Sequence, residues 1–173
     1  GTMSASPQDL MTAKLFFNAA FPTMQVLLDD DPKLHKKFQN FNATVQFGAM
    51  NDGELLCCHL IFQNGNLTVV QGPAEKSDIS LTFSSVEKMN SLLKGGLSLP
   101  SIKGNLSLLP NVLSILMGLK IMTKPNDKLK NDTEKLLKVK CSLYMITRAL
   151  SQYNKLGDPD MQEFCRRQPD RIY

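Results

Sequence analysis

The sequence predicts an α+β fold in which helices cover one face of a largely antiparallel sheet. Four segments between residues 44 and 83 alternate apolar and polar side chains, which is the period of a half-buried strand. Turn-forming residues separate the first three of these segments, and helical patterns lie before and after them. With 173 residues, of which 42% are hydrophobic, the chain fits one globular domain with a substantial core.

Two helices are predicted before the sheet. Ser6 is a good N-cap, and Pro7 at the first helical position loses no hydrogen bond, so a helix should begin there. Pro22 should end or kink it. The run Asp29-Asp30-Asp31 marks a second helix start, because its negative charge suits the positive end of the helix dipole; metal binding by this run is the weaker alternative. His35 has no second imidazole at ligand spacing and is predicted to lie on the surface.

The first three strands are predicted to form a meander. Thr44 to Met50 alternates, and Asn51-Asp52-Gly53 is a hairpin signal because these residues tolerate positive φ. The second strand, Glu54 to Gln63, is joined by Asn64-Gly65 to a third at Asn66 to Gln71. Successive strands should therefore pair antiparallel.

A fourth strand, a capped helix and an apolar helix follow. Asp78 to Phe83 alternates, so one of its faces should lie in the core. Ser84 to Glu87 has the S-x-x-E pattern of a capping box, which predicts a helix start there and a stop at Gly95-Gly96. Pro110 is placed to begin the next helix. That helix is apolar almost all round as far as Leu119, so we expect it to be buried on several sides or to face a cavity.

The order and spacing of these elements resemble those of a sterol carrier protein type 2 domain. The family has an alternating strand, a helix with a glycine or lysine-glycine turn, a short strand ending in a lysine-glycine pair, and an apolar helix. Here these are Asp78 to Phe83, Ser85 to Lys94, Ser101 to Gly104 and Leu106 to Leu119. The similarity covers residues 41–119, and no single motif in it is diagnostic. It is the main ground for a fifth strand, and thus for an SCP2-like five-stranded sheet in a domain of residues 7–119.

The resemblance implies a protein that binds a hydrophobic ligand in a tunnel between sheet and helices and acts as a carrier or transfer protein. Sterols, fatty acids, fatty acyl-CoAs and similar lipids are the ligand class. The binding residues of the family vary, so we predict the lining residues from the inward parity of the strands and the apolar helix faces. They are Leu60, Phe62, Ile79, Leu81, Phe83, Leu92, Val112, Leu116 and Leu119. The alternative is a non-enzymatic accessory or scaffold domain with a filled core, acting through a partner protein.

The sequence offers little for catalysis. Cys57-Cys58-His59 is the one dense cluster of reactive side chains. Adjacent strand residues point to opposite faces, so Cys58 and His59 cannot readily form a nucleophile–base pair, and Cys57 and His59 have no evident third partner. Hydrolase-elbow, Walker, dinucleotide and zinc-protease motifs are absent from the sequence. We therefore predict no catalytic residues, no metal, no cofactor and no enzyme activity.

The net charge of +4 arises beyond the family-like region. Residues 1–119 hold 8 basic and 9 acidic residues, a net −1, whereas residues 120–173 hold 12 basic and 7 acidic residues, a net +5. A basic surface attracts anionic headgroups, so an anionic membrane surface is expected as a transient partner. The basic residues are not interleaved with aromatic ones, which argues against nucleic acid. A simple solvated helix face is the commoner explanation of such a charge surplus.

The two ends of the chain are expected to lie outside the family-like domain. Residues 1–6 are predicted to be disordered or cloning-derived, and residues 120–173 to form a C-terminal extension with one long helix. From Leu136 to Tyr153 apolar residues recur every three or four positions, a stripe that packs against other helices. We favour packing on the same domain, giving a monomer, over a dimer through this helix. Four cysteines without C-x-x-C spacing and the lack of an export signal predict a reducing, cytoplasmic location.

Overall fold

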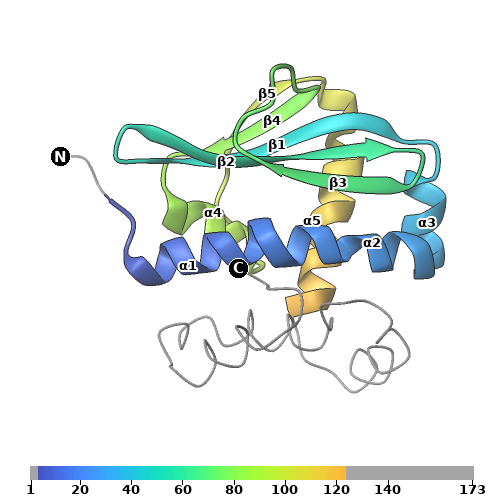
Figure 1. Ribbon diagram of the computed structural model, residues 1–173, viewed down its shortest axis with the longest axis horizontal. Helices are drawn as coiled ribbons and strands as arrows, with labels where there is room; N and C mark the ends of the chain where they lie inside the picture. The colour runs from blue at the N-terminus through green and yellow to red at the C-terminus, as the bar shows by residue number, and fades with distance from the viewer. Residues whose placement is uncertain (1–3, 124–173) are drawn as a thin grey trace.

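The computed structural model describes residues 4–123 and confirms the α+β class (Figure 1). The predicted helical extension and its stripe from Leu136 to Tyr153 lie outside the described residues and stay predictions. In chain order the elements are α1 (Pro7–Leu15), the π-helical turn η1 (Phe16–Ala20), α2 (Phe21–Asp30), α3 (Pro32–Phe38), β1 (Asn42–Asn51), β2 (Glu54–Gln63), β3 (Asn66–Gln71), β4 (Ile79–Phe83), α4 (Val86–Leu93), β5 (Ser101–Gly104), the 3-10 turn η2 (Leu106–Leu108) and α5 (Leu109–Thr123).

The sheet has five strands in the order β3-β2-β1-β4-β5, with β1 at its centre. Strands β1, β2 and β3 pair antiparallel in succession, as do β4 and β5, whereas β1 and β4 run parallel. The two hairpin turns take the positive φ that their residues favour: 55° at Asp52, 81° at Gly53, 49° at Asn64 and 86° at Gly65. The predicted meander, the fifth strand and the largely antiparallel pairing are thus confirmed.

Residues 72–78 carry the chain from the edge strand β3 across β2 and β1 to β4 without a helix. Side chains on the outer face of the sheet hold this crossover. His59 Nδ1 lies 2.8 Å from the Gly72 carbonyl oxygen, and Gln46 Oε1 accepts from the Ala74 N–H at 2.9 Å. Asp78 completes it, because its N–H donates to the Thr44 carbonyl at 2.9 Å and its carboxylate accepts the Thr44 N–H at 2.7 Å. The parallel pairing of β1 and β4 begins from this junction.

Two of the predicted helix caps are present and the third is displaced by one residue. The Ser6 hydroxyl accepts the Asp9 N–H at the start of α1, and Asp31 accepts two N–H groups at the start of α3. At α4 the cap is Ser85, which accepts the Lys88 N–H at 3.2 Å. The predicted cap at Ser84 is therefore wrong, because it is Ser85 that takes the extended backbone an N-cap needs, with φ −151° and ψ 158°.

The first helical stretch is interrupted before Pro22 but does not stop there. Between α1 and α2 the backbone forms the π-helical turn η1, where the Phe21 N–H donates to the Phe16 carbonyl, five residues earlier. Proline lacks an N–H and its ring crowds the preceding turn of a helix. A π-helical turn is wider than an α-helical one and so relieves this crowding. The helical path therefore continues through α2 to Asp30.

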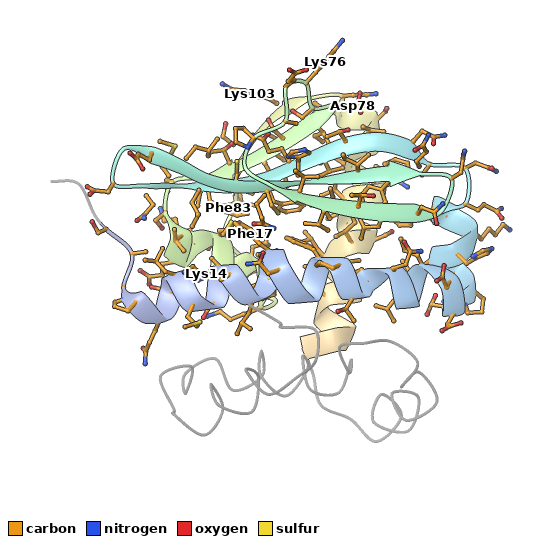
Figure 2. All side chains as sticks on the ribbon, viewed as in Figure 1. Lys14, Phe17, Lys76, Asp78, Phe83 and Lys103 are labelled. Atoms are coloured by element: carbon orange, nitrogen blue, oxygen red, sulfur yellow. The ribbon has the colours of Figure 1, made fainter. Side chains whose placement is uncertain are left out.

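The core lies between the helices and the inner face of the sheet. Figure 2 shows Phe17 and Phe83 in this layer, and Lys76 and Lys103 beyond the sheet in solvent. At its centre the rings of Phe21 and Phe47 lie 5.4 Å apart, and both residues are fully buried. A second aromatic group, with centroid distances of 5.1–5.3 Å, joins α3 to β2. It consists of Phe38, Phe41 and Phe62.

Candidate functional site

The nine residues predicted to line a tunnel come from β2, β4, α4 and α5, and all belong to or pack against one apolar core. Seven of them are buried, with exposed fractions of at most 3%. These are Leu60, Phe62, Ile79, Leu81, Phe83, Val112 and Leu119. Leu92 and Leu116 are partly buried against the same core. The structure therefore brings the nine together in one interior, and their contact with a ligand stays a prediction.

Helix α5 has an apolar face in the core and another in solvent. Val112, Ile115 and Leu119 form its buried stripe, whereas Leu113 and Met117 are 59% and 58% exposed. Partly buried Leu116 lies between the two faces, since helical spacing places it next to both Val112 and Leu113. Burial on several sides, one of the two alternatives expected for this helix, is therefore wrong for this face, whereas the other alternative, that the helix faces a cavity, stays a prediction.

Gly118 allows α5 to lie close against the N-terminal helices. A Cβ at this position would be 3.1 Å from Met24 Cε and 3.6 Å from Leu27 Cδ1, both in α2, and 3.8 Å from Leu34 Cδ1 in α3. The missing side chain thus fixes where α5 crosses α2 and α3. This crossing keeps the buried stripe of α5, Val112, Ile115 and Leu119, against the core.

The most exposed apolar side chains lie in the segment between α4 and α5. Leu97 and Leu99, in the loop before β5, are 96% and 88% exposed, and Leu106 in η2 is 58% exposed. Large apolar side chains that stay in water are typical of interaction surfaces when they gather in a patch. This group was not predicted, because Leu97-Ser98-Leu99-Pro100 has no helical period; two leucines in a loop are the signal that the sequence offers.

The cysteine–histidine cluster is divided between the two faces of the sheet. The register places Cys57 and His59 beside Gly48 and Gln46 on the outer face, while Cys58 lies beside Phe47 in the core. Burial raises the pKa of both thiols, and the neighbouring Cys57 adds to the rise at Cys58. A protonated thiol is a poor nucleophile, so this geometry gives no support to thiol catalysis.

The buried Cys58 thiol should make stability fall at alkaline pH. An exposed thiol has a pKa near 9.0, whereas burial raises the pKa of Cys58 well above that value. Above about pH 9 the unfolded chain loses a proton that the folded protein keeps, so the free energy of unfolding falls by up to about 1.4 kcal/mol per pH unit. Urea unfolding from about pH 8 to pH 10 should show a shallower fall in Cys58→Val than in wild type. Identical slopes would refute this assignment.

One polar side chain lies inside the apolar stripe of α4. Asn90 is fully buried between Met89 and Leu93, and its Nδ2 donates to the Asp9 carbonyl oxygen of α1 at 2.9 Å. Its Oδ1 is buried and has no hydrogen-bond partner. Lys94, four residues later, has its pKa lowered by burial, an effect that the carboxylates of Asp9 and Glu87 oppose. Asn90 was not predicted to be buried, and its signal in the sequence is an amide at a core position of the helix.

Neither a metal centre nor a membrane span is found in the part of the chain that the structure describes. Within residues 4–123, no three His, Cys, Asp or Glu side chains are grouped so that they could hold a metal ion. The helices of the same region include none with the length and apolar character needed to cross a bilayer.

Comparison with known proteins finds no matching family model and no matching curated protein. Among solved structures, the chain is similar to sterol carrier protein domain 2 of Helicoverpa armigera, with 17% identity and a TM-score of 0.47 over 72% of this chain and 99% of that one. It is also similar to a UbiJ-SCP2 ubiquinone synthesis protein, with 14% identity and a TM-score of 0.42 over 64% and 96%. Sterol carrier protein 2 of Yarrowia lipolytica, in its apo form, matches with 20% identity and a TM-score of 0.41 over 56% and 93%. Sterol carrier protein 2 domains are thus among the solved structures to which this chain is similar.

Proposed function

We propose that the protein binds a hydrophobic ligand between the inner sheet face and helices α4 and α5, and acts as a lipid carrier or transfer protein without enzyme activity. The observation that carries this proposal is the exposure of α5, which is apolar on its solvent side as well as on its core side. Leu113 and Met117 are more than half exposed, and Leu116 links them to the buried stripe. When a hydrocarbon chain covers apolar side chains that lie in water, the free energy falls, because apolar surface is removed from water.

Such a carrier would work in the cytoplasm and contact an anionic membrane surface. The highly exposed Leu97 and Leu99 could enter the headgroup region of a membrane, and the basic residues after position 119 would attract an anionic one. Contact of this kind would be transient. The two described cysteines, Cys57 and Cys58, are free buried thiols, which is in keeping with the cytoplasmic location predicted from the sequence.

The second candidate function is an accessory or scaffold domain that acts through a partner protein. Dense packing on the sheet side of the interior favours it. Phe62, Ile79 and Phe83 are at most 2% exposed, and the ring centroids of Phe38 and Phe62 are only 5.1 Å apart. Interiors packed in this way leave few voids larger than a water molecule. In this function the exposed leucines would contact protein instead of lipid.

Native mass spectrometry of the purified full chain, combined with displacement of a fluorescent fatty acid, distinguishes the two functions. A carrier should retain a hydrophobic ligand, or bind and exchange the fluorescent one at micromolar concentration. A domain with a filled core should do neither. Absence of both a retained ligand and displacement would overturn the carrier proposal.

Leu116→Glu should weaken lipid binding about tenfold or more while the protein still folds. Leu116 is only partly buried, so the new carboxylate can reach water in the empty protein but would have to be desolvated beneath a bound hydrocarbon chain. Fluorescent fatty acid titration measures the loss, and circular dichroism verifies folding. Leu55→Glu is the control, since Leu55 lies on the outer face of β2, is 40% exposed, and its substitution should leave binding nearly unchanged.

If Leu116→Glu aggregates while Leu116→Ala binds lipid normally, Leu116 does not contact the ligand. That pair of results would mean that the leucine belongs to the packed core. In that case the charge would destabilise the fold, because burying an unpaired carboxylate costs several kcal/mol.

A further inference from the structure

The sheet has two edge strands, β3 and β5, and they differ in how they are covered. At the β3 edge, Gln25 of α2 accepts the Leu67 N–H at 2.7 Å and donates to the Gly65 carbonyl oxygen at 2.9 Å. At the opposite edge all four residues of β5, Ser101–Gly104, are exposed, and within residues 4–123 no further strand pairs with them. An exposed edge strand can pair with a strand of another chain. This β5 edge is therefore a candidate docking surface.

The hydrogen bonds along β5 show which of its backbone groups point away from the sheet. In an antiparallel pair, residues that exchange hydrogen bonds with the partner strand alternate with residues that do not. The Asn105 N–H donates to the Asp78 carbonyl oxygen at 2.8 Å, and Gly104 lies opposite Ile79, which sets this alternation. Ile102 and Gly104 are therefore the residues whose N–H and C=O groups point away from β4. An added strand would form its hydrogen bonds with these two residues.

The side chains around the β5 edge are apolar or basic. Ile102 lies on the core-facing side of the strand but is 38% exposed, and Leu99 and Leu106, which flank β5 in the sequence, are 88% and 58% exposed. Lys103 lies beyond the sheet in solvent (Figure 2). Residues 88–119 contain three lysines and no aspartate or glutamate. This surface is thus complementary to a partner that is apolar and acidic.

A second copy of the chain fits the β5 edge poorly. Antiparallel pairing of two β5 strands that uses both free residues sets Ile102 of one copy opposite Gly104 of the other. Lys103 then lies directly opposite the same lysine of the other copy, on the same face of the joined sheet. Like charges directly opposite each other on two strands are destabilising. A strand with a carboxylate at this place is the better partner.

A bilayer fits the backbone of this edge poorly as well. Hydrocarbon has no hydrogen-bond donors or acceptors, so it would leave the N–H and C=O groups of Ile102 and Gly104 without partners, whereas an extended peptide supplies both. Membrane contact by Leu97 and Leu99, which precede β5, would not use these groups. The backbone of β5 therefore favours a peptide.

We propose that the β5 edge docks an extended, acidic and apolar segment of a partner protein, which adds to the sheet as an antiparallel strand. The backbone of the segment pairs with Ile102 and Gly104, and its apolar side chains lie beside Ile102 on the core-facing side. An aspartate or glutamate of the segment lies opposite Lys103. Such docking goes beyond lipid carriage and is independent of whether a lipid is bound.

Fluorescence anisotropy with the labelled peptide Ser-Leu-Thr-Val-Glu-Leu-Thr-Ser tests this docking on the full chain. Its glutamate is placed to lie opposite Lys103, with the neighbouring valine opposite Gly104 and the following leucine opposite Ile102. Wild type should bind this peptide about fivefold more tightly than the same peptide with lysine in place of glutamate, because a cross-strand charge pair replaces a repulsion. In Lys103→Glu the preference should reverse, and the exposure of this residue means that the variant should fold.

N-methylated peptides separate strand addition from simple charge attraction. A methyl group on the nitrogen of the leucine opposite Ile102 removes the N–H that would donate to the Ile102 carbonyl oxygen, so affinity should fall about fivefold or more. A methyl group on the glutamate nitrogen, which would point away from β5, is the matched control and should have a much smaller effect. Equal losses for the two peptides would overturn the proposal.

Amide hydrogen exchange of wild type tests the open edge directly. The Ile102 and Gly104 amides should exchange rapidly in the protein alone and become protected when the peptide is bound. The Lys103 amide, which faces β4, should be protected in both states. Slow exchange at Ile102 and Gly104 before peptide is added would mean that another part of this chain or a second copy already covers the edge, and the proposal would be wrong.

The remaining outcomes are also decisive. If the peptide does not bind, or if its preference for glutamate is unchanged in Lys103→Glu, the β5 edge is not the docking site. Binding to vesicles of phosphatidylglycerol and phosphatidylcholine without binding to the peptide would assign the exposed leucines to a membrane and overturn the proposal. Lipid carriage is tested separately by the fluorescent fatty acid, so the failure of one function leaves the other in place.

Discussion

Gly104→Ala should lower the free energy of unfolding by about 3 kcal/mol or more, because it combines backbone strain with overlap of backbone atoms. Gly104 ends β5 with φ +108°, a conformation that residues with a Cβ rarely adopt. A Cβ there would overlap the Asp78 carbonyl oxygen and lie 3.0 Å from Ile79 Cα. The same carbonyl accepts the Asn105 N–H at 2.8 Å, so it cannot move without loss of that bond. Urea unfolding followed by circular dichroism measures the change.

Gly53→Ala is the matched control for Gly104→Ala. Gly53 also has positive φ, +81°, but a Cβ there would have no heavy atom within 4 Å. Only the conformational cost remains, about 1–2 kcal/mol. Equal losses for the two variants would show that the contact with Asp78 contributes nothing.

Phe47→Ala should destabilise the protein by about 3–5 kcal/mol, since it removes a large side chain from the centre of the core. Phe47 lies in β1, the central strand, opposite Cys58 of β2 and Leu81 of β4. It is fully buried, and its ring lies 5.4 Å from that of Phe21. No neighbouring strand can move in to fill the space without loss of sheet hydrogen bonds. Denaturant unfolding monitored by circular dichroism gives the difference.

Met50→Ala, near the end of the same strand, is the control for Phe47→Ala. Met50 is 38% exposed, so its truncation should change stability by less than about 1 kcal/mol. A loss below about 1.5 kcal/mol for Phe47→Ala would contradict the expectation. It would mean that the layer between sheet and helices can collapse around the missing ring.

Local chemistry in the sequence was sufficient to predict the meander. The bounds predicted for β2 and β3 are those observed, Glu54–Gln63 and Asn66–Gln71, because each strand lies between turn residues that can take positive φ. The helix starts at Ser6 and Asp31 were also predictable, since a cap is an interaction between neighbouring residues. The fifth strand was harder to predict. All four of its residues are exposed, so it has no clear apolar alternation, and its position was inferred from the family resemblance.

Features that depend on residues far apart in sequence could not be predicted in this way. The crossover of residues 72–78 is held by His59 and Gln46 of other strands, and nothing in the crossover itself reveals them. The exposed side of α5 looks like a buried helix in the sequence, because its apolar residues do not show which of them face water. The hydrogen bond from Asn90 to the Asp9 carbonyl oxygen depends in the same way on the packing of α1 against α4.

The strand order has a consequence for how the chain folds. The hairpins that join β1, β2 and β3 close over a few residues and can form as soon as Gln71 is present. The other edge of β1 is different, because its partner β4 begins only at Ile79 and pairs with it in parallel across the crossover. Until β4 arrives, the central strand presents unpaired backbone groups and the apolar side chains of Val45 and Phe47, a combination that favours association between chains. Closing this edge is the non-local step, so we infer that the docking of β4, more than the formation of the meander, sets how quickly a newly made chain is protected from aggregation.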